Sequence, residues 1–125
     1  HQFRQSAFPC LKIGLSMARE TLYERIDKRV GAMIETGLAR EVRMLLDKGY
    51  SASLKSMQSI GYRHMAGYLL NHQSWGETVR TLKRDTRRYA KRQMTWFKTD
   101  AQIHWAAPSE TDTMDGLIEA FLNRT

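Results

Sequence analysis

Residues 74–98 form the segment that most restricts how this chain can fold. Ser74 and Glu77 match a capping box, in which a serine caps the first turn of a helix and a glutamate three residues later reaches back to it. Winding the sequence from there at ~100° per residue separates an apolar side from a basic side. The apolar side consists of Val79, Leu82, Thr86, Tyr89, Ala90, Gln93 and Phe97. We therefore predict one long amphipathic helix.

The net charge of the chain is concentrated in this helix. The chain carries 20 Lys and Arg against 13 Asp and Glu, a formal net charge of +7 at pH 7. Residues 80–98 contain eight basic residues and one acidic residue, Asp85, so this segment alone accounts for +7. We name the eight the basic stripe: Arg80, Lys83, Arg84, Arg87, Arg88, Lys91, Arg92 and Lys98. Such a concentration is typical of a polyanion-binding surface, although membrane surfaces and calmodulin also bind basic amphipathic helices.

The rest of the chain is predicted to be mostly helical. Apolar residues recur at helical spacing in several segments, and Gly37 follows the first of them as a good helix stop. Helices are expected at about 19–36, 38–49, 57–69 and 74–98 and after Pro108, with strands at 11–17 and 101–106. The fold class is thus mainly α-helical, with about five helices and two short strands. Because two strands alone are marginal in water, we expect them to belong to a larger sheet.

Length and composition exclude several classes of protein. A chain of 125 residues fits a single domain with a modest core, and 42% hydrophobic and 26% charged residues are ordinary for a folded soluble protein. No apolar run is long enough to cross a membrane, and no signal peptide is visible. The single cysteine, Cys10, favours a reducing, cytoplasmic setting. Because the sequence begins with His1 rather than Met, we expect a fragment of a longer protein.

The sequence contains no motif that marks a catalytic centre of its own. A GxxxxGK[ST] phosphate loop is absent, and no Ser/His/Asp arrangement can be argued. Three of the four histidines have no metal-ligand spacing with Cys10 or with each other, so no metal site is expected; the three are His64, His72 and His104.

Residues 86–98 combine the two kinds of side chain that RNA binding requires. Cations bind phosphates, and flat groups stack on unpaired bases. The cations favour a functional surface, because an idle helix face normally mixes Glu among its Lys and Arg. The aromatic residues Tyr89 and Phe97 fall on the apolar side, which favours a place in the core for these two.

Two smaller patterns have both structural and functional interpretations. In residues 58–63, Gly61 permits a close backbone approach beside Tyr62 and Arg63, although a glycine at a helix crossing is the commoner explanation. Arg25 and Arg29 are four residues apart and so neighbours on a helix surface. Such a pair can hold a phosphate or diphosphate, but an ion pair with nearby Glu24 or Asp27 is equally possible, and the spacing alone favours the ion pair.

Three stretches together resemble the tRNA dimethylallyltransferase (tRNA isopentenyltransferase) family. They are residues 12–46, 56–69 and 86–105, which occur in the order found in the family, and the run RRYAKRQMTWF within the last is the most specific. The resemblance implies a P-loop nucleotide-kinase-like α/β core with a helical insertion, of which this chain is the C-terminal part. It also implies transfer of a dimethylallyl group from dimethylallyl diphosphate to N6 of a flipped-out adenosine beside the anticodon, with Mg²⁺ as cofactor.

The resemblance also implies roles for individual residues. The tRNA-contacting residues would be Gln58, Ser59, Ile60, Gly61, Tyr62, Arg63, Arg87, Arg88, Lys91, Arg92, Gln93, Met94, Thr95, Trp96, Phe97 and Lys98. Arg25 would contact the prenyl diphosphate and stabilise its charge as it departs. The partners would be the anticodon stem-loop of tRNA and dimethylallyl diphosphate, with no membrane, and the intact enzyme would be a cytoplasmic monomer.

The expected domain is one piece over residues 1–125, without the family's P-loop, general base or insertion domain. The isolated chain is therefore predicted to be inactive, while the intact protein is an enzyme. Two alternatives stay open at this point: a stand-alone helical module that binds RNA, and a purely structural fragment without catalysis.

Overall fold

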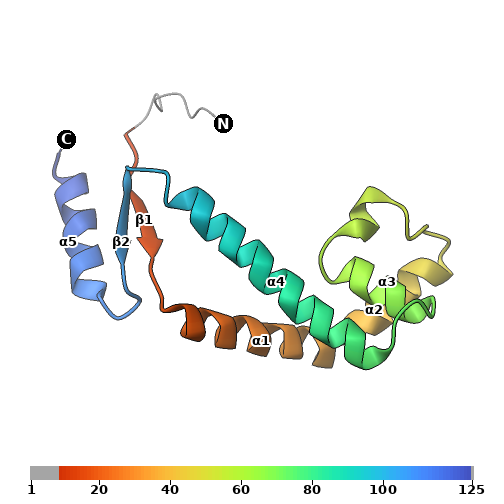
Figure 1. Cartoon of the computed structure of the whole chain (residues 1–125). Coiled ribbons are helices and arrows are strands. Elements are labelled where there is room, and N and C mark those ends of the chain that lie inside the picture. The colour runs from red at the N-terminus through yellow and green to blue at the C-terminus, as the bar shows by residue number, and fades with distance from the viewer. Residues whose placement is uncertain (1–8, 125) are drawn as a thin grey trace. The chain divides into compact units, whose positions relative to one another are not determined.

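The structure, a computed structural model, describes residues 9–124 (Figure 1). Its elements, in order, are β1 (Lys12–Leu15), α1 (Arg19–Glu35), α2 (Leu38–Asp47), the 3₁₀ helix η1 (Lys55–Gln58), α3 (Tyr62–Leu69), α4 (Trp75–Phe97), β2 (Ile103–Ala106) and α5 (Thr111–Leu122). Five α-helices and two short strands within this range confirm the predicted fold class. The single domain predicted over residues 1–125 extends beyond the described range and stays a prediction.

The described residues group into two compact units. One runs from Glu20 to Arg92, and the other takes in the residues up to Arg19 and from Gln93 onward. The first unit contains the hydrophobic core, to which α1, α2, η1, α3 and α4 each contribute. Its buried residues are Ile26, Val30, Leu38, Val42, Met57, Met65, Ala66 and Leu82. Apolar side chains at helical spacing thus bury one side of each helix, as the sequence predicts.

The first half of α4 is buried more deeply in the core than its second half, from which Ala90 packs against the core. Its buried residues are Thr78, Thr81 and Leu82, near the start of the helix. The threonines can be buried because their hydroxyls donate to main-chain oxygens, as from Thr78 to Ser74 at 2.8 Å. By contrast, Tyr89 is 48% exposed and Phe97 is 40% exposed. The expectation that these two aromatics belong to the core is therefore wrong, because a helix of 23 residues outruns the small cluster on which it packs.

Two glycines set the ends of helices. Gly37 has a φ of 102° and ends α1 just before α2 begins at Leu38. The helix predicted over residues 57–69 is divided, because Gly61 has a φ of 92° and α3 begins only after it. The preceding turn, η1, serves instead to insert Met57 into the core, where it is 2% exposed. Residues with a side chain adopt the left-handed backbone of Gly61 only at a cost in free energy.

The second unit is built on a two-stranded parallel sheet. β1 pairs with β2 in register from Lys12 opposite Ile103 to Leu15 opposite Ala106. A side chain at Gly14 would lie 2.7 Å from the ring of Trp105, so only glycine lets that ring approach the strand. The ammonium of Lys12 also bonds Asp100 at 2.8 Å. The predicted strands are confirmed, and their membership of a larger sheet stays a prediction.

We predict opposite effects of alanine at two glycines of one region. Gly61→Ala should lower the free energy of unfolding by about 1–2 kcal/mol, because its left-handed backbone disfavours a side chain. The nearest atom to the added methyl group would be 3.5 Å away on Leu38, so backbone strain rather than a clash accounts for the cost. Gly67→Ala, inside α3 with no atom within 4 Å of the added carbon, should be stabilising by up to ~1 kcal/mol. Urea unfolding measures both, and equal effects would contradict the assignment of strain to Gly61.

Candidate nucleic-acid interface

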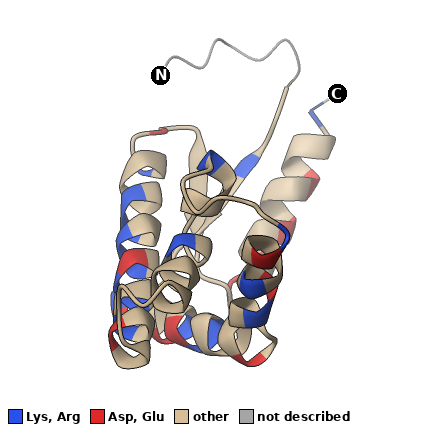
Figure 2. Ribbon diagram, turned by 90° about the vertical axis from the view of Figure 1, so that its right-hand side faces the viewer, with Lys and Arg blue, Asp and Glu red and all other residues tan. Residues whose placement is uncertain are grey.

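The basic stripe is not uniform in the structure, because three of its arginines form ion pairs. Arg80 bonds Glu77 through two nitrogens at 2.9 and 2.6 Å, within α4. Arg84 bonds Asp85 at 3.0 Å. Figure 2, in which Lys and Arg are blue and Asp and Glu red, shows acidic positions among the basic ones along the helices. The concentration of charge seen in the sequence is therefore partly neutralised in the fold.

Arg87 joins α4 to α1. Its Nε and Nη2 donate to the two carboxylate oxygens of Asp27 at 2.9 and 2.6 Å, and its guanidinium lies 5.7 Å from the ring centre of Tyr23. The hydrogen bond to Asp27 raises the pKa of Arg87 further. This bidentate geometry is the strong form of an arginine–carboxylate pair. A tRNA contact by Arg87 stays a prediction, but its guanidinium already has a partner within the fold.

Three other members of the basic stripe have no such partner in the part of the chain that the structure describes. Within residues 9–124, no carboxylate lies within ion-pairing distance of Arg88, Arg92 or Lys98. Arg88 and Arg92 are also exposed at the surface of α4. These three cations, all beyond Arg87, are therefore available to an external anion.

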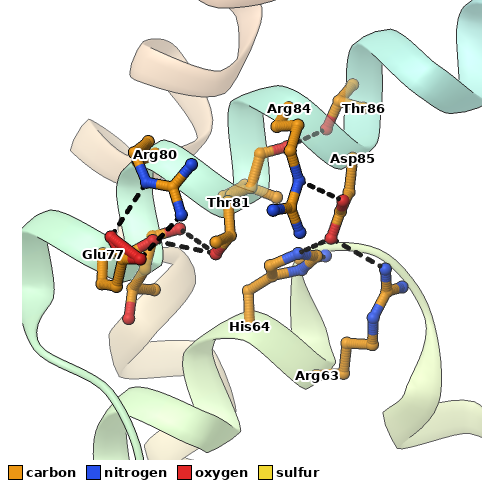
Figure 3. Close-up of polar contacts among 11 residues, drawn as sticks. Arg63, His64, Glu77, Arg80, Thr81, Arg84, Asp85 and Thr86 are labelled. Carbon is orange, nitrogen blue, oxygen red and sulfur yellow. Dashed lines mark hydrogen bonds and ion pairs between the residues drawn. The ribbon is translucent and has the colours of Figure 1, made fainter.

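A buried histidine connects residues 58–63 to α4. His64 is 6% exposed, and its Nε2 lies 2.8 Å from Asp85 Oδ2 (Figure 3). The main-chain N–H of Gly61 donates to its Nδ1 at 3.2 Å. Because Nδ1 accepts this bond, the ring proton is assigned to Nε2, which donates to Asp85. His64 stands three residues after the N-cap, the position at which a glutamate or glutamine usually closes a capping box.

Asp85 accepts hydrogen bonds from three side chains. Besides His64, they are Arg63 Nη2 at 3.2 Å and Arg84 Nε at 3.0 Å (Figure 3). Burial raises the pKa of Asp85, but the hydrogen bonds from His64 and Arg84 outweigh it and lower the pKa to about 2. Burial is also the largest influence on His64, and it lowers the pKa of the imidazole, which stays neutral. One carboxylate thereby holds the start of α3 against α4.

The predicted tRNA-binding residues fall into two groups. Gln58, Ser59, Ile60 and Arg63 line the same cavity as Arg88 and Arg92, so the structure brings these two sequence segments together. Tyr62, next to them, donates to Glu41 at 2.6 Å. In the second unit, Met94, Trp96 and Phe97 line a separate cavity beside β1 and β2. Trp96 and Phe97 meet edge to face at 5.0 Å, and both are exposed.

Arg25 is exposed on α1, the helix that the sequence predicts for it. The alternative in which Arg25 or Arg29 pairs with Glu24 or Asp27 is not realised, because Asp27 bonds Arg87 instead. Sequence reasoning missed the role of His64 and Asp85. The spacing of His64 from Gly61 was the available signal, but it required knowing that a helix begins at Tyr62.

Two classes of feature are absent from residues 9–124. No three His, Cys, Asp or Glu side chains gather there in a way that could hold a metal ion. None of the helices in this range combines the length and the apolar character needed to span a bilayer.

We predict that glutamine, but not alanine, can replace His64. His64→Ala should lower the free energy of unfolding by about 1–3 kcal/mol, because Asp85 loses a buried donor and the Gly61 N–H loses its acceptor. His64→Gln should retain most of the stability, since an amide offers both an acceptor and a donor. Thermal or urea unfolding distinguishes the two variants, and equal losses would show that the imidazole acts only by filling space.

The pH dependence provides the control for this prediction. Because burial lowers the pKa of native His64, the unfolded chain binds a proton more readily, and stability should fall as the pH drops below ~6.5. His64→Gln should remove that part of the dependence. The contribution of Asp85 should persist to lower pH and be lost between ~4 and 2, because its pKa is lowered to about 2. A profile unchanged by His64→Gln would contradict the assignment of a neutral native imidazole.

Comparisons with known proteins agree with the resemblance found in the sequence. The family model described as IPP transferase matches residues 1–100. The tRNA dimethylallyltransferase of Desulfatibacillum aliphaticivorans is 51% identical over 122 residues, which are 98% of this chain and 40% of that protein. The enzyme of the same name from Geobacter metallireducens is 45% identical over 97% of the chain and 40% of its own length. The chain therefore spans about 40% of the length of these curated relatives.

Two solved structures share the fold of the described residues. The full-length tRNA isopentenylpyrophosphate transferase of Bacillus halodurans matches 95% of this chain and 42% of its own, with a TM-score of 0.81 and 36% identity. The tRNA delta(2)-isopentenylpyrophosphate transferase of Staphylococcus epidermidis matches 92% of this chain and 38% of its own, with a TM-score of 0.81 and 40% identity. The order of the three stretches, the family model and the shared fold agree, and the chain belongs to the IPP transferase family.

Proposed function

We propose that this chain supplies the tRNA-binding part of an intact tRNA dimethylallyltransferase. That enzyme moves a dimethylallyl group from dimethylallyl diphosphate to N6 of an adenosine beside the anticodon of its tRNA. The names of the relatives support the activity. The observation that carries the role of this chain is the cavity shared by residues 58–63 and the unpaired arginines of α4. Two segments assigned to tRNA by resemblance thus meet around one surface.

The chemistry of this surface suits an RNA backbone. Arg88, Lys91 and Arg92 follow one another along the exposed half of α4 and offer planar and point charges to phosphates. In the other unit, and separately from this surface, Trp96 and Phe97 present exposed rings on which unpaired bases can stack. The His64–Asp85 connection holds Arg63 and the backbone of Gly61 in place beforehand, which lowers the entropy that binding must remove.

Arg25 is proposed to contact the prenyl diphosphate. Arg25 is exposed and has no carboxylate partner among residues 9–124, so its guanidinium can donate two parallel hydrogen bonds to phosphate oxygens. Its charge would stabilise the negative charge that develops on the diphosphate as the bond to the dimethylallyl carbon breaks. Residues 9–124 do not fit Mg²⁺, since they offer no group of ligands for it, so we derive no step through the metal. Magnesium, a monomeric state and the cytoplasm belong to the proposal for the intact enzyme.

A stand-alone RNA-binding module is the second candidate. The observation that favours it is that residues 20–92 form a compact unit with its own hydrophobic core. In either case the RNA-binding residues are the same, and the two differ in whether prenyl transfer accompanies binding.

The tRNA-binding role predicts that alanine substitutions at neighbouring basic residues of α4 have different effects in the intact enzyme. Arg88→Ala with Lys91→Ala should weaken tRNA binding and make the dependence of log K on log salt shallower by ~0.7 for each lost phosphate contact. The free energy of unfolding should change by less than ~0.5 kcal/mol per site, because both are exposed. Arg87→Ala should instead cost about 1–2 kcal/mol of stability, because it leaves Asp27 without its partner. Filter binding at several salt concentrations and urea unfolding measure the two quantities. Normal tRNA binding by the double variant would favour a purely structural role.

The role of Arg25 predicts a selective loss in the use of one substrate. Arg25→Ala should lower kcat/KM for dimethylallyl diphosphate about ten- to a hundredfold, the cost of one charge-assisted contact, while tRNA affinity stays nearly unchanged. Arg25→Lys should restore activity only in part, because it keeps the charge and loses the planar fork. Steady-state kinetics with each substrate varied in turn makes the measurement, and Lys28→Ala, also exposed on α1, is the matched control. Unaltered diphosphate kinetics in Arg25→Ala would remove this residue from the active site.

A further inference from the structure

A cavity of about 640 Å³ lies among α1, residues 58–63 and α4, wholly within the unit from Glu20 to Arg92. Four arginines and one carboxylate line it: Arg29, Arg63, Arg88, Arg92 and Asp85. α1 thus contributes to this surface through Arg29, a residue that the resemblance does not assign to tRNA. We name this cavity the arginine pocket.

The positive charge of the arginine pocket is only partly neutralised from within. Asp85 is engaged by Arg63 at 3.2 Å and by Arg84 and His64 as well, so its charge is already satisfied. Among residues 9–124, no carboxylate lies within ion-pairing distance of Arg29, Arg88 or Arg92. Guanidinium groups gathered around one cavity repel each other, and an anion from outside would relieve that repulsion.

The uncharged residues that line the pocket indicate which group is attached to the anion. Val30, Met33 and Ile60 also line the cavity, so an apolar surface lies beside the charges. Tyr89 adds an aromatic ring that is 48% exposed. The volume falls in the range of ~300–1,000 Å³ typical of small-molecule sites and exceeds what a phosphate alone would fill. A phosphate joined to a flat ring, which is a nucleotide, matches both the charged and the apolar parts.

We propose that the arginine pocket is a subsite for one nucleotide of a single-stranded RNA segment. Its phosphate is held by Arg29, Arg88 and Arg92, and its base lies over the apolar lining beside Tyr89. An RNA strand is favoured over a free nucleotide because Lys83 and Lys91, two further cations of the basic stripe in the same unit, lie on α4 outside the pocket, which suits further phosphates of the same strand. The inference rests on the proposed function and deepens it, since it confines part of the tRNA contact to one nucleotide.

The test combines protein variants with single changes in the RNA. The probe is a labelled anticodon stem-loop RNA, bound to the intact enzyme, in which one loop phosphate at a time is replaced by a neutral methylphosphonate. Arg29→Gln with Arg92→Gln removes two pocket charges. Arg40→Gln with Arg43→Gln is the matched control, because it removes two exposed arginines of α2 that lie outside both the pocket and the basic stripe. Unfolding is measured for every variant, so that a folding defect is recognised.

The pocket variant should bind the RNA about 10- to 100-fold more weakly than the wild type, and the control within about threefold. One methylphosphonate position should weaken wild-type binding and have no further effect in the pocket variant. Because Arg29 and Arg92 share one phosphate, the double variant should lower the salt dependence by ~0.7, and not by twice that amount.

The outcomes separate this inference from the function on which it rests. A wild-type enzyme that does not bind the stem-loop would overturn the proposed function itself. Tight binding by the wild type and equally tight binding by the pocket variant would overturn the pocket alone. Losses spread evenly over several methylphosphonate positions would mean that the arginines act as a diffuse surface. Displacement of the RNA by free adenosine monophosphate, dependent on Arg29, would assign the pocket to a free nucleotide instead of an RNA strand.

Discussion

The carboxylate of Asp85 is the point on which the arrangement of the core unit and its basic surface depends. It is the only acidic residue in the segment that carries the whole net charge of the chain. Its oxygens accept from Arg63, Arg84 and His64, and through His64 the interaction extends to the backbone of Gly61. The hydrogen bonds from His64 and Arg84 favour the charged form of this partly buried carboxylate, which is why its pKa is lowered despite burial. One negative charge thereby fixes how the left-handed turn before α3 meets α4.

The long helix α4 serves two purposes along its length, and the physical reason is the size of the core. Its first turns bury Thr78, Thr81 and Leu82, and Arg87 then makes a last connection to Asp27 of α1. Beyond Arg87, Ala90 still packs against the core, but Arg88 and Arg92 have no ion-pair partner among the described residues and remain exposed. A helix that is anchored at one end holds the backbone of the cations at its other end in place before an anion binds, so that only their side chains must be immobilised.

The proposed tRNA contact follows from this division. Residues 58–63 and the exposed arginines belong to different parts of the sequence, and each is weak as a signal for RNA when taken alone. They line one cavity because η1 buries Met57, Gly61 turns the chain, and His64 joins the turn to α4. Arg29 enters the same cavity from α1. The surface is thus a product of packing, and Arg29, Arg88 and Arg92 present charges there that packing leaves without an ion-pair partner among the described residues.

The sequence by itself determined the helices, the strands, the concentration of positive charge and the family, because these depend on local spacing, capping residues and specific runs of residues. It could not determine which cations of the stripe are available to an external anion. Glu77, the partner of Arg80, is three residues away in the same helix, but Asp27, the partner of Arg87, is 60 positions away along the chain. The burial of Tyr89 and Phe97 was predicted wrongly for a similar reason, because helical periodicity says which side faces a core and not how far the core extends. Only the tertiary structure decided that Asp85 is an anchor and that Arg29, Arg88 and Arg92 surround one cavity, because ion pairs and cavities form between segments that are distant along the chain.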